Sequence, residues 1–282
     1  MYKLLATDID DTVLAVDGSL PAATRDALKR LHEAGVVVVF SSGRADVSIR
    51  SVASKIVELA DDEYLISFNG ARVVTALSGT PLVELPLSPE MVAQVLSYTR
   101  PRKLVVQAYT GDRFLVEVDG PRPRQYAADT GMSYDVVPDL AVAVEAAGGT
   151  PKLLIIDEHE VLATHLPKLQ SFGPGVPGSP DATAGWTATF SKPHYLEVVR
   201  EGVNKGVALA RLADHLGISI DETLAVGDSL NDREMIEAAG LGVAVANARQ
   251  ELKAVADAVT ERSADEAAIA EVAERWFGVK GA

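Results

Sequence analysis

The segment Ala6-Thr7-Asp8-Ile9-Asp10-Asp11-Thr12-Val13-Leu14 follows the apolar run that opens the chain and determines how the remaining sequence is interpreted. It begins at the end of a predicted β-strand, Tyr2–Thr7, and α/β folds gather their functional residues at the carboxyl ends of such strands. Side chains two residues apart in an extended segment point the same way, so the carboxylates of Asp8 and Asp10 can face one site. One carboxylate could then attack a substrate while the other moves protons. Taken alone, these residues would also fit a turn or a helix N-cap.

Length and charge limit the classes of function. The chain has 282 residues, of which 48% are hydrophobic and 23% charged, as is usual for a folded soluble protein of two domains or one elaborated domain. Its formal net charge of −14 argues against a nucleic-acid partner or an anionic membrane surface, because both require a positive field. A small anionic substrate stays possible, since a metal ion and one lysine can reverse the sign locally.

Cysteine usage and hydropathy exclude further classes. The chain has no cysteine, which rules out disulfides, thiolate zinc sites and a cysteine nucleophile. The first predicted strand starts within a few residues of Met1 and leaves no room for a signal peptide. The longest apolar run, around Val36–Phe40, is far shorter than the ~20 residues of a membrane span. We therefore expect a cytoplasmic protein, monomeric or homodimeric, with no membrane partner.

Strands and helices alternate at both ends of the chain. The fully apolar, β-branched segment Val36–Phe40 is typical of a parallel sheet that is covered on both faces. The same pattern of strand and helix resumes from Lys205. The predicted elements after the first strand are the helices Pro21–Ala34, Ala45–Leu59, Lys205–Leu216 and Asp232–Ala239, and the strands Val36–Phe40, Tyr64–Ser67, Thr223–Val226 and Gly242–Ala244.

The middle of the chain has a different pattern. Its predicted strands are short and of antiparallel type, and Phe172–Gly185 is rich in Gly and Pro and predicts a loop. The chain is expected to return to the first sheet at about Tyr195–Val199. We therefore predict an α/β core formed by residues 1–84 and 191–282, with an α+β domain inserted at 85–190. The predicted middle elements are the strands Ala71–Ala76, Pro81–Leu85, Lys103–Ala108, Arg113–Val118 and Lys152–Ile156, and the helices Pro89–Thr99 and Val161–Leu169.

Two further segments carry groups that suit an anion. In Phe40-Ser41-Ser42-Gly43-Arg44 a strand runs into a turn of small residues, where the Ser42 hydroxyl and the backbone N–H groups around Gly43 could hold an anionic oxygen. A serine N-cap followed by a glycine turn would look the same. Lys205 opens a predicted helix, although the helix dipole disfavours a positive charge there. It either holds an anion or is a solvated lysine.

A fourth segment, Ala225-Val226-Gly227-Asp228-Ser229-Leu230-Asn231-Asp232, adds two carboxylates. Asp228 follows a predicted strand and Asp232 stands at the head of the next helix, so the pair could flank one cation. Together with Asp8 they supply the hard oxygen ligands that Mg²⁺ prefers. Asp232 alone would also fit a favourable acid at a helix N-terminus.

These segments, in this order, resemble the four motifs of haloacid dehalogenase-superfamily phosphatases of the Cof type, over essentially the whole chain. The resemblance implies a Rossmann-like, parallel-sheet core with an inserted cap domain that selects the substrate. The segments that carry it are Asp8–Thr12, Ser42–Arg44, Lys205 and Gly227–Asp232, together with Asn69-Gly70-Ala71 and Gly242–Ala248, which are typical of the subgroup.

The resemblance implies roles for the catalytic residues. Asp8 would attack phosphorus and become an aspartyl phosphate, and Asp10 would protonate the leaving alcohol and then activate water. Mg²⁺ would be held by Asp8, the backbone carbonyl of Asp10 and Asp228, with support from Asp232.

The resemblance also implies the contacts to the substrate. Ser42, Gly43, Lys205 and Asn231 would bind the phosphoryl group. Arg44, Asn69 and His194 are candidates for the substrate side of the site.

The expected activity is hydrolysis of a small phosphorylated metabolite, with sugar phosphates first. A sugar phosphomutase and a non-catalytic binding protein are the alternatives. Three departures from the family pattern stand out: Ser42 in place of a common threonine, Asp11 in place of a common glycine, and Asp265–Ala270 in place of a common Asp-Gly-Val-Ala-like run.

Overall fold

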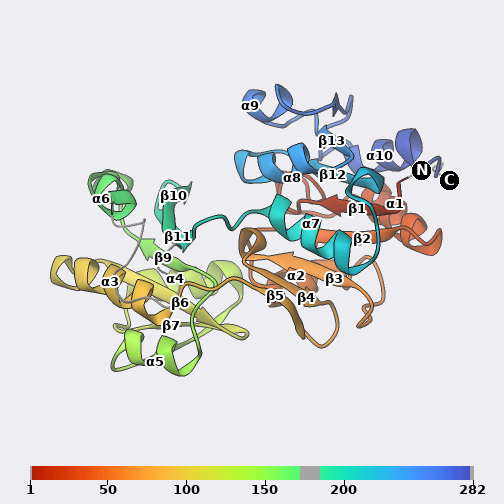
Figure 1. Cartoon of the computed structure of the whole chain (residues 1–282). Helices are drawn as coiled ribbons and strands as arrows, with labels where there is room; N and C mark the ends of the chain where they lie inside the picture. The colour runs from red at the N-terminus through yellow and green to blue at the C-terminus, as the bar shows by residue number, and fades with distance from the viewer. Residues whose placement is uncertain (1, 172–184, 280–282) are drawn as a thin grey trace. The chain divides into compact units, whose positions relative to one another are not determined.

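The computed structural model describes residues 2–171 and 185–279. These residues form two compact units, and each is described by itself. The first unit comprises Met1–Val83 and Asn204–Ala282, which are coloured red to orange and cyan to blue in Figure 1. The second unit, Glu84–Val203, is coloured from yellow through green to teal.

Among the described residues, the first unit contains an eight-stranded sheet in the order β14-β13-β12-β1-β2-β3-β4-β5. The pairs from β14 to β3 are parallel, and β3 and β4 pair antiparallel. All four residues of β1 are buried, which explains its continuous apolar sequence. The strands are β1 (Leu4–Thr7), β2 (Val37–Ser41), β3 (Tyr64–Ser67), β4 (Arg72–Thr75), β5 (Pro81–Glu84), β12 (Thr223–Gly227), β13 (Leu241–Ala244) and β14 (Ala258–Val259).

Helices cover both faces of this sheet (Figure 1). The crossovers β1–α1–β2 and β12–α8–β13 run in opposite directions from the centre of the sheet, so right-handed connections place α1 and α8 on opposite faces. Helix α1 packs beside α10, and α7 packs beside α8. The helices are α1 (Ala22–Glu33), α2 (Asp46–Ala53), α7 (Lys205–His215), α8 (Arg233–Ala238), α9 (Gln250–Lys253) and α10 (Ala268–Trp276).

The order of strands decides where the motifs meet. Strand β1 lies between β12 and β2, with Thr7 in register with Val226 on one side and with Phe40 on the other. The segments that follow these three strands therefore emerge at one edge of the sheet, although more than 200 residues separate the first from the last.

The second unit contains a six-stranded sheet in the order β10-β11-β9-β6-β7-β8. Its pairs are antiparallel from β10 to β7, and β7 and β8 pair in parallel. Apolar residues of α3, α5 and α6 form a core with this sheet, for example Leu96, Val144 and Leu162. The elements are α3 (Pro89–Thr99), β6 (Val105–Thr110), β7 (Arg113–Val116), α4 (Pro121–Thr130), β8 (Ser133–Val136), α5 (Leu140–Ala146), β9 (Leu153–Ile156), α6 (His159–Ser171), β10 (Trp186–Lys192) and β11 (Tyr195–Arg200).

One predicted boundary differs from the structure. We expected the chain to rejoin the first sheet at about Tyr195–Val199, with the core resuming at residue 191. Strand β11 instead pairs with β9 and β10, and the second unit extends to Val203. The alternating sequence of β11 fits a strand in either sheet, so the pattern alone did not identify its partners. The predicted loop Phe172–Gly185 lies outside the described residues except for Gly185.

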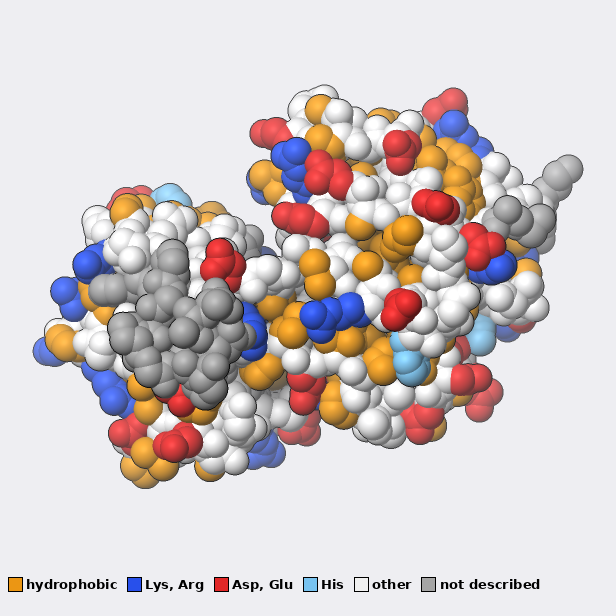
Figure 2. Space-filling view, viewed as in Figure 1, with side chains coloured by type: hydrophobic (Ala, Val, Ile, Leu, Met, Phe, Trp, Pro, Cys, Tyr) orange, Lys and Arg blue, Asp and Glu red, His pale blue; other side chains and the backbone are white. Residues whose placement is uncertain are grey.

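Charged side chains of both signs lie on the surface. On the face shown in Figure 2, acidic and basic side chains are interspersed over the described residues. Within residues 2–171 and 185–279, no helix is both long and apolar enough to cross a membrane.

Candidate active site

The centre of the site is a buried lysine between two buried carboxylates. Lys205 Nζ lies 2.6 Å from Asp8 Oδ1 and 2.6 Å from Asp232 Oδ1. The lysine side chain is fully buried, as is that of Asp232. Lys205 is the first residue of α7, whose N-cap Asn204 accepts a hydrogen bond from the backbone N–H of Val207. The packing of α7 therefore places the ammonium group of Lys205 at the end of β1.

The second carboxylate pair comes from the turn after β12. One oxygen of Asp232, Oδ2, accepts hydrogen bonds from the backbone N–H groups of Asp228 and Ser229, each at 3.1 Å. A Cβ at Gly227 would lie 2.5 Å from that of Asp232, so this position requires a glycine for the close approach. Thr12 donates its hydroxyl to Asp228 at 3.4 Å. The turn thus fixes Asp228 beside β1.

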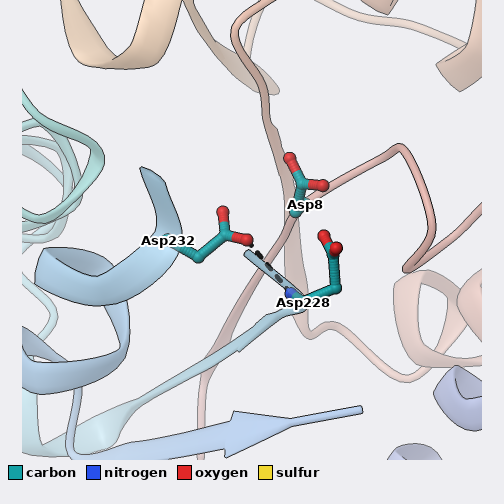
Figure 3. Close-up of side chains that lie close together, drawn as sticks. All are labelled: Asp8, Asp228 and Asp232. Carbon is teal, nitrogen blue, oxygen red and sulfur yellow. Dashed lines mark hydrogen bonds between the residues drawn. The ribbon is translucent and has the colours of Figure 1, made fainter. Parts of the chain in front are cut away.

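Three carboxylates converge at this point (Figure 3). Asp8, Asp228 and Asp232 each offer an oxygen, and these oxygens lie within 4.8 Å of one another. Burial raises the pKa of Asp8 well above its ordinary value, against the opposing effect of Lys205. Burial and the neighbouring Asp232 raise the pKa of Asp228 to about 7. One ammonium group therefore does not balance the negative charge, and the donors are the hard oxygens that Mg²⁺ prefers, so the residues fit this ion.

Asp10 is placed differently from Asp8. Its carboxylate is more than half exposed and accepts two hydrogen bonds from the guanidinium of Arg44, one of them at 2.9 Å. This ion pair raises the pKa of Arg44. The structure therefore brings Asp10 together with Arg44, and the Asp10 side chain does not join the carboxylates of Asp8, Asp228 and Asp232.

Ser42 and Asn69 lie on two adjoining loops. Ser42 is buried directly after β2, and its Oγ accepts a hydrogen bond from the backbone N–H of Arg44 at 3.2 Å. Asn69 follows β3 and accepts a hydrogen bond from the side chain of Asn231 at 3.2 Å. A Cβ at Gly43 would lie 3.0 Å from Asn69 Oδ1, so the two loops are in contact.

His194 stands apart from this group. It belongs to the second unit, where Nδ1 lies 3.6 Å from a carboxylate oxygen of Glu158. Its assignment to the substrate side stays a prediction.

Several residues of the site were not predicted. Asp46 accepts hydrogen bonds from Ser67 and Arg72, beneath the loop that carries Asn69. Asn247 donates its amide to the backbone oxygen of Asp11 at 2.8 Å. Asn247 lies in a segment that already resembled the family, but its contact depends on the tertiary fold and has no local signal.

Comparison with known proteins identifies the family. The sequence model of the haloacid dehalogenase-like hydrolase family matches residues 5–272. The chain belongs to this family, as its motifs predicted, and the expected hydrolase fold is confirmed by solved structures.

Relatives and solved structures are similar over nearly the whole chain. An HMP-PP phosphatase of Cronobacter sakazakii is 34% identical over 90% of this chain and 88% of its own length. The phosphatase YwpJ of Bacillus subtilis is 30% identical over 92% and 94%. The crystal structure of TM0651 from Thermotoga maritima has a TM-score of 0.85 at 31% identity, with 98% and 97% of the two chains covered.

Proposed function

We propose that this protein is a Mg²⁺-dependent phosphomonoester hydrolase that acts on small phosphorylated metabolites, with sugar phosphates as the first class to test. The observation that carries the proposal is the buried contact of Lys205 with Asp8 and Asp232, next to Asp228. Membership of the hydrolase family and the names of its phosphatase relatives support the same reaction.

The reaction has two steps at Asp8. A carboxylate oxygen of Asp8 attacks phosphorus, a bond forms between that oxygen and phosphorus, and the bond from phosphorus to the alcohol oxygen breaks. The alcohol oxygen takes a proton from Asp10. Asp10 then removes a proton from water as the water attacks the aspartyl phosphate, which releases inorganic phosphate and restores Asp8. Division into two steps lowers the barrier of each.

Neutralisation of the negative charge on the phosphoryl oxygens lowers the barrier to transfer. Lys205 lies against Asp8 and can neutralise the equatorial phosphoryl oxygens, while the hydroxyl of Ser42 and the amide of Asn231 can donate hydrogen bonds to them. Mg²⁺, held by Asp8, Asp228 and the backbone carbonyl of Asp10, would supply further positive charge to the same oxygens. Asp8 and Asp232 are buried and Asp228 is half-buried, so an anionic substrate beside these three carboxylates requires this compensation.

Arg44 contacts the proton-transfer group. Its guanidinium donates two hydrogen bonds to Asp10, one to each carboxylate oxygen. Transfer of a proton to the leaving alcohol requires one of these oxygens to face that alcohol instead. We therefore expect the contact between Arg44 and Asp10 to loosen when the phosphate ester binds.

The test is release of inorganic phosphate from a panel of sugar, nucleotide and cofactor monoesters, with Mg²⁺ or with EDTA. Mg²⁺-dependent release is expected, and Asp8→Asn should abolish it. The matched control is Asp26→Asn, the same chemical change at a half-exposed site on α1. Release by Asp8→Asn at the wild-type rate would refute the covalent mechanism. Interconversion of isomers without net release would instead identify a phosphomutase.

A further inference from the structure

The loop after β3 has an unusual backbone. Phe68 and Asn69 are consecutive non-glycine residues with positive φ angles of 50° and 56°. This left-handed region disfavours residues that carry a Cβ, and asparagine tolerates it better than most. A turn of this kind persists only where the surrounding structure holds it.

Two sets of contacts hold the turn. The backbone N–H groups of Phe68 and Asn69 donate to the carbonyl oxygens of Arg44 and Ser42, each at 3.0 Å. Below them the buried carboxylate of Asp46 accepts hydrogen bonds from Ser67 and Arg72, on either side of the turn. The loop of Asn69 is therefore attached both to the Ser42–Arg44 loop and to the start of α2.

The side chain of Asn69 reaches the motif after β12. Asn231 Nδ2 donates to Asn69 Oδ1 at 3.2 Å, and Ser229 Oγ donates to Asn231 Oδ1 at 2.6 Å. In this arrangement the amide oxygen of Asn231 faces Ser229 and its amide nitrogen faces Asn69. An amide nitrogen carries two hydrogens, so Asn231 keeps one N–H beyond its bond to Asn69.

The orientation matters because the proposed substrate group is anionic. An N–H group attracts a phosphoryl oxygen, whereas a flipped amide would present its carbonyl oxygen and repel it. Asn231 lies on the exposed turn between β12 and α8, where packing alone does not fix its rotamer. The hydrogen bond to Asn69 and the hydrogen bond from Ser229 supply this constraint, one at each end of the amide.

We propose that Asn69 is a positioning residue of the active site, which holds the Asn231 amide with an N–H group directed to the transferring phosphoryl group. This inference rests on the proposed phosphatase function. Asn69 then lies on the phosphoryl side of the site. The sequence had predicted a contact of Asn69 with the rest of the substrate.

A double-mutant cycle tests the proposal. Asn69→Gly removes the amide and fits the left-handed backbone, so the fold should be retained or stabilised. Asn231→Ala removes the positioned group. Each single variant should lower kcat/KM by about tenfold, the value of one hydrogen bond to a charged group. The double variant should lose about tenfold as well, because the two residues act as one unit.

A control and a second readout separate positioning from other roles. Ala267 also has a positive φ, 63°, at the N-cap of α10, so Ala267→Gly makes the same backbone change outside the site and should leave kcat/KM unchanged. A residue that acts on the phosphoryl group should affect all esters alike. A loss with Asn69→Gly that varies between esters would overturn the proposal, as would multiplicative losses in the double variant or a wild-type rate for Asn69→Gly.

Failure of the proposed function can be distinguished from failure of this inference. If wild-type protein releases phosphate from no ester, the phosphatase proposal fails. The same cycle is then measured as binding of inorganic phosphate in the presence of Mg²⁺ by isothermal titration calorimetry. Equal weakening in the two single variants and the double variant would support the coupling of Asn69 to Asn231, and additive weakening or none would overturn it.

Discussion

A buried lysine with two carboxylate partners is both a structural and a chemical feature of this molecule. Lys205 is fully buried, and Asp8 and Asp232 together place more charge beside it than it can balance. Removing one member of such a group leaves uncompensated charge in a dry site. Stability and catalysis are therefore most closely linked at these three side chains.

Lys205→Met should test that link. The methionine keeps an apolar stem of similar shape but leaves two buried carboxylates without a cation, so we expect a loss of about 3–5 kcal/mol in the free energy of unfolding without Mg²⁺. Loss of a preorganised positive group should also lower kcat by roughly 10²–10³. Urea unfolding and turnover measure the two effects. Unchanged stability would contradict a stabilising role of the buried ammonium group.

Asp228 predicts a pH dependence of metal binding. In the metal-free folded protein its pKa is raised to about 7, whereas the ordinary value in an unfolded chain is near 3.8. Between these two pH values the folded protein holds a proton on Asp228 that the unfolded chain has released. The free energy of unfolding should therefore fall as pH rises between these two values and level off above them. Mg²⁺ must displace the proton, so its affinity should rise with pH up to about 7.

Calorimetric titration with Mg²⁺ at about pH 5.5 and at about pH 8 measures this effect. Asp228→Asn cannot titrate and should bind Mg²⁺ weakly at both values. An equal affinity of the wild-type protein at the two pH values would show that the proton on Asp228 does not compete with the metal.

The residues of the site were predictable where their spacing carried the information. The two-residue spacing of Asp8 and Asp10 and the four-residue spacing of Asp228 and Asp232 indicated converging groups, and the structure does bring Asp8, Asp228 and Asp232 together. Asp46 was not predictable in the same way. At the start of a helix it is indistinguishable from a favourable N-terminal acid, and its partners Ser67 and Arg72 are identified only by the fold.

At the scale of the element, most helices and strands with clear periodicity were predicted to within a few residues, but the helices α4 and α10 were not predicted. Helix α3 has the predicted bounds, whereas α2 ends at Ala53 instead of the predicted Leu59. Apolar residues after Ala53, such as Ile56, lie in turns but are still buried. The apolar pattern therefore continues beyond the end of the helix and made the predicted helix too long. Short elements such as α5 and β14 have too few residues for a period to appear.

Two positions with a left-handed backbone also belong to this scale. Asp11 and Ala267 are not glycines, yet both adopt positive φ, at 54° and 63°. These turns form without the residue that best fits them. Ala267→Gly should accordingly raise the free energy of unfolding by about 1 kcal/mol, which urea unfolding would measure. A loss of stability would indicate that the alanine methyl group contributes more by packing than it costs in backbone strain.

The contact between α7 and α8 predicts the effect of a single methyl group. A Cβ at Gly206 would lie 2.2 Å from the carbonyl oxygen of Glu234. Gly206→Ala should separate the two helices, lower the free energy of unfolding by about 1–3 kcal/mol and reduce kcat, because Lys205 moves with α7. Urea unfolding and turnover are the measurements.

Arg211→Ala, at an exposed position of the same helix, is the matched control and should change stability by less than about 0.5 kcal/mol. Wild-type turnover in Gly206→Ala would show that the position of α7 tolerates the added methyl group.

At the scale of the whole molecule, the carboxylates that fit Mg²⁺ all belong to the first unit. Binding of Mg²⁺ should therefore slow amide hydrogen exchange at the turns after β1 and β12 and at the start of α7, and leave β6 and β9 of the second unit unchanged. Exchange measured with Mg²⁺ and with EDTA would show the pattern. Slower exchange throughout both sheets would mean that the two units open together.

The first unit is assembled from the two ends of the chain, and this has a consequence for its biosynthesis. Strand β1 is made first, but its neighbour β12 begins at residue 223. During translation one edge of β1 stays unpaired until β12 has been made, while the second unit, Glu84–Val203, is contiguous and can fold earlier. The nascent chain thus carries an unpaired edge of an apolar strand while the whole second unit is made, and such an edge is the kind of surface that chaperones protect.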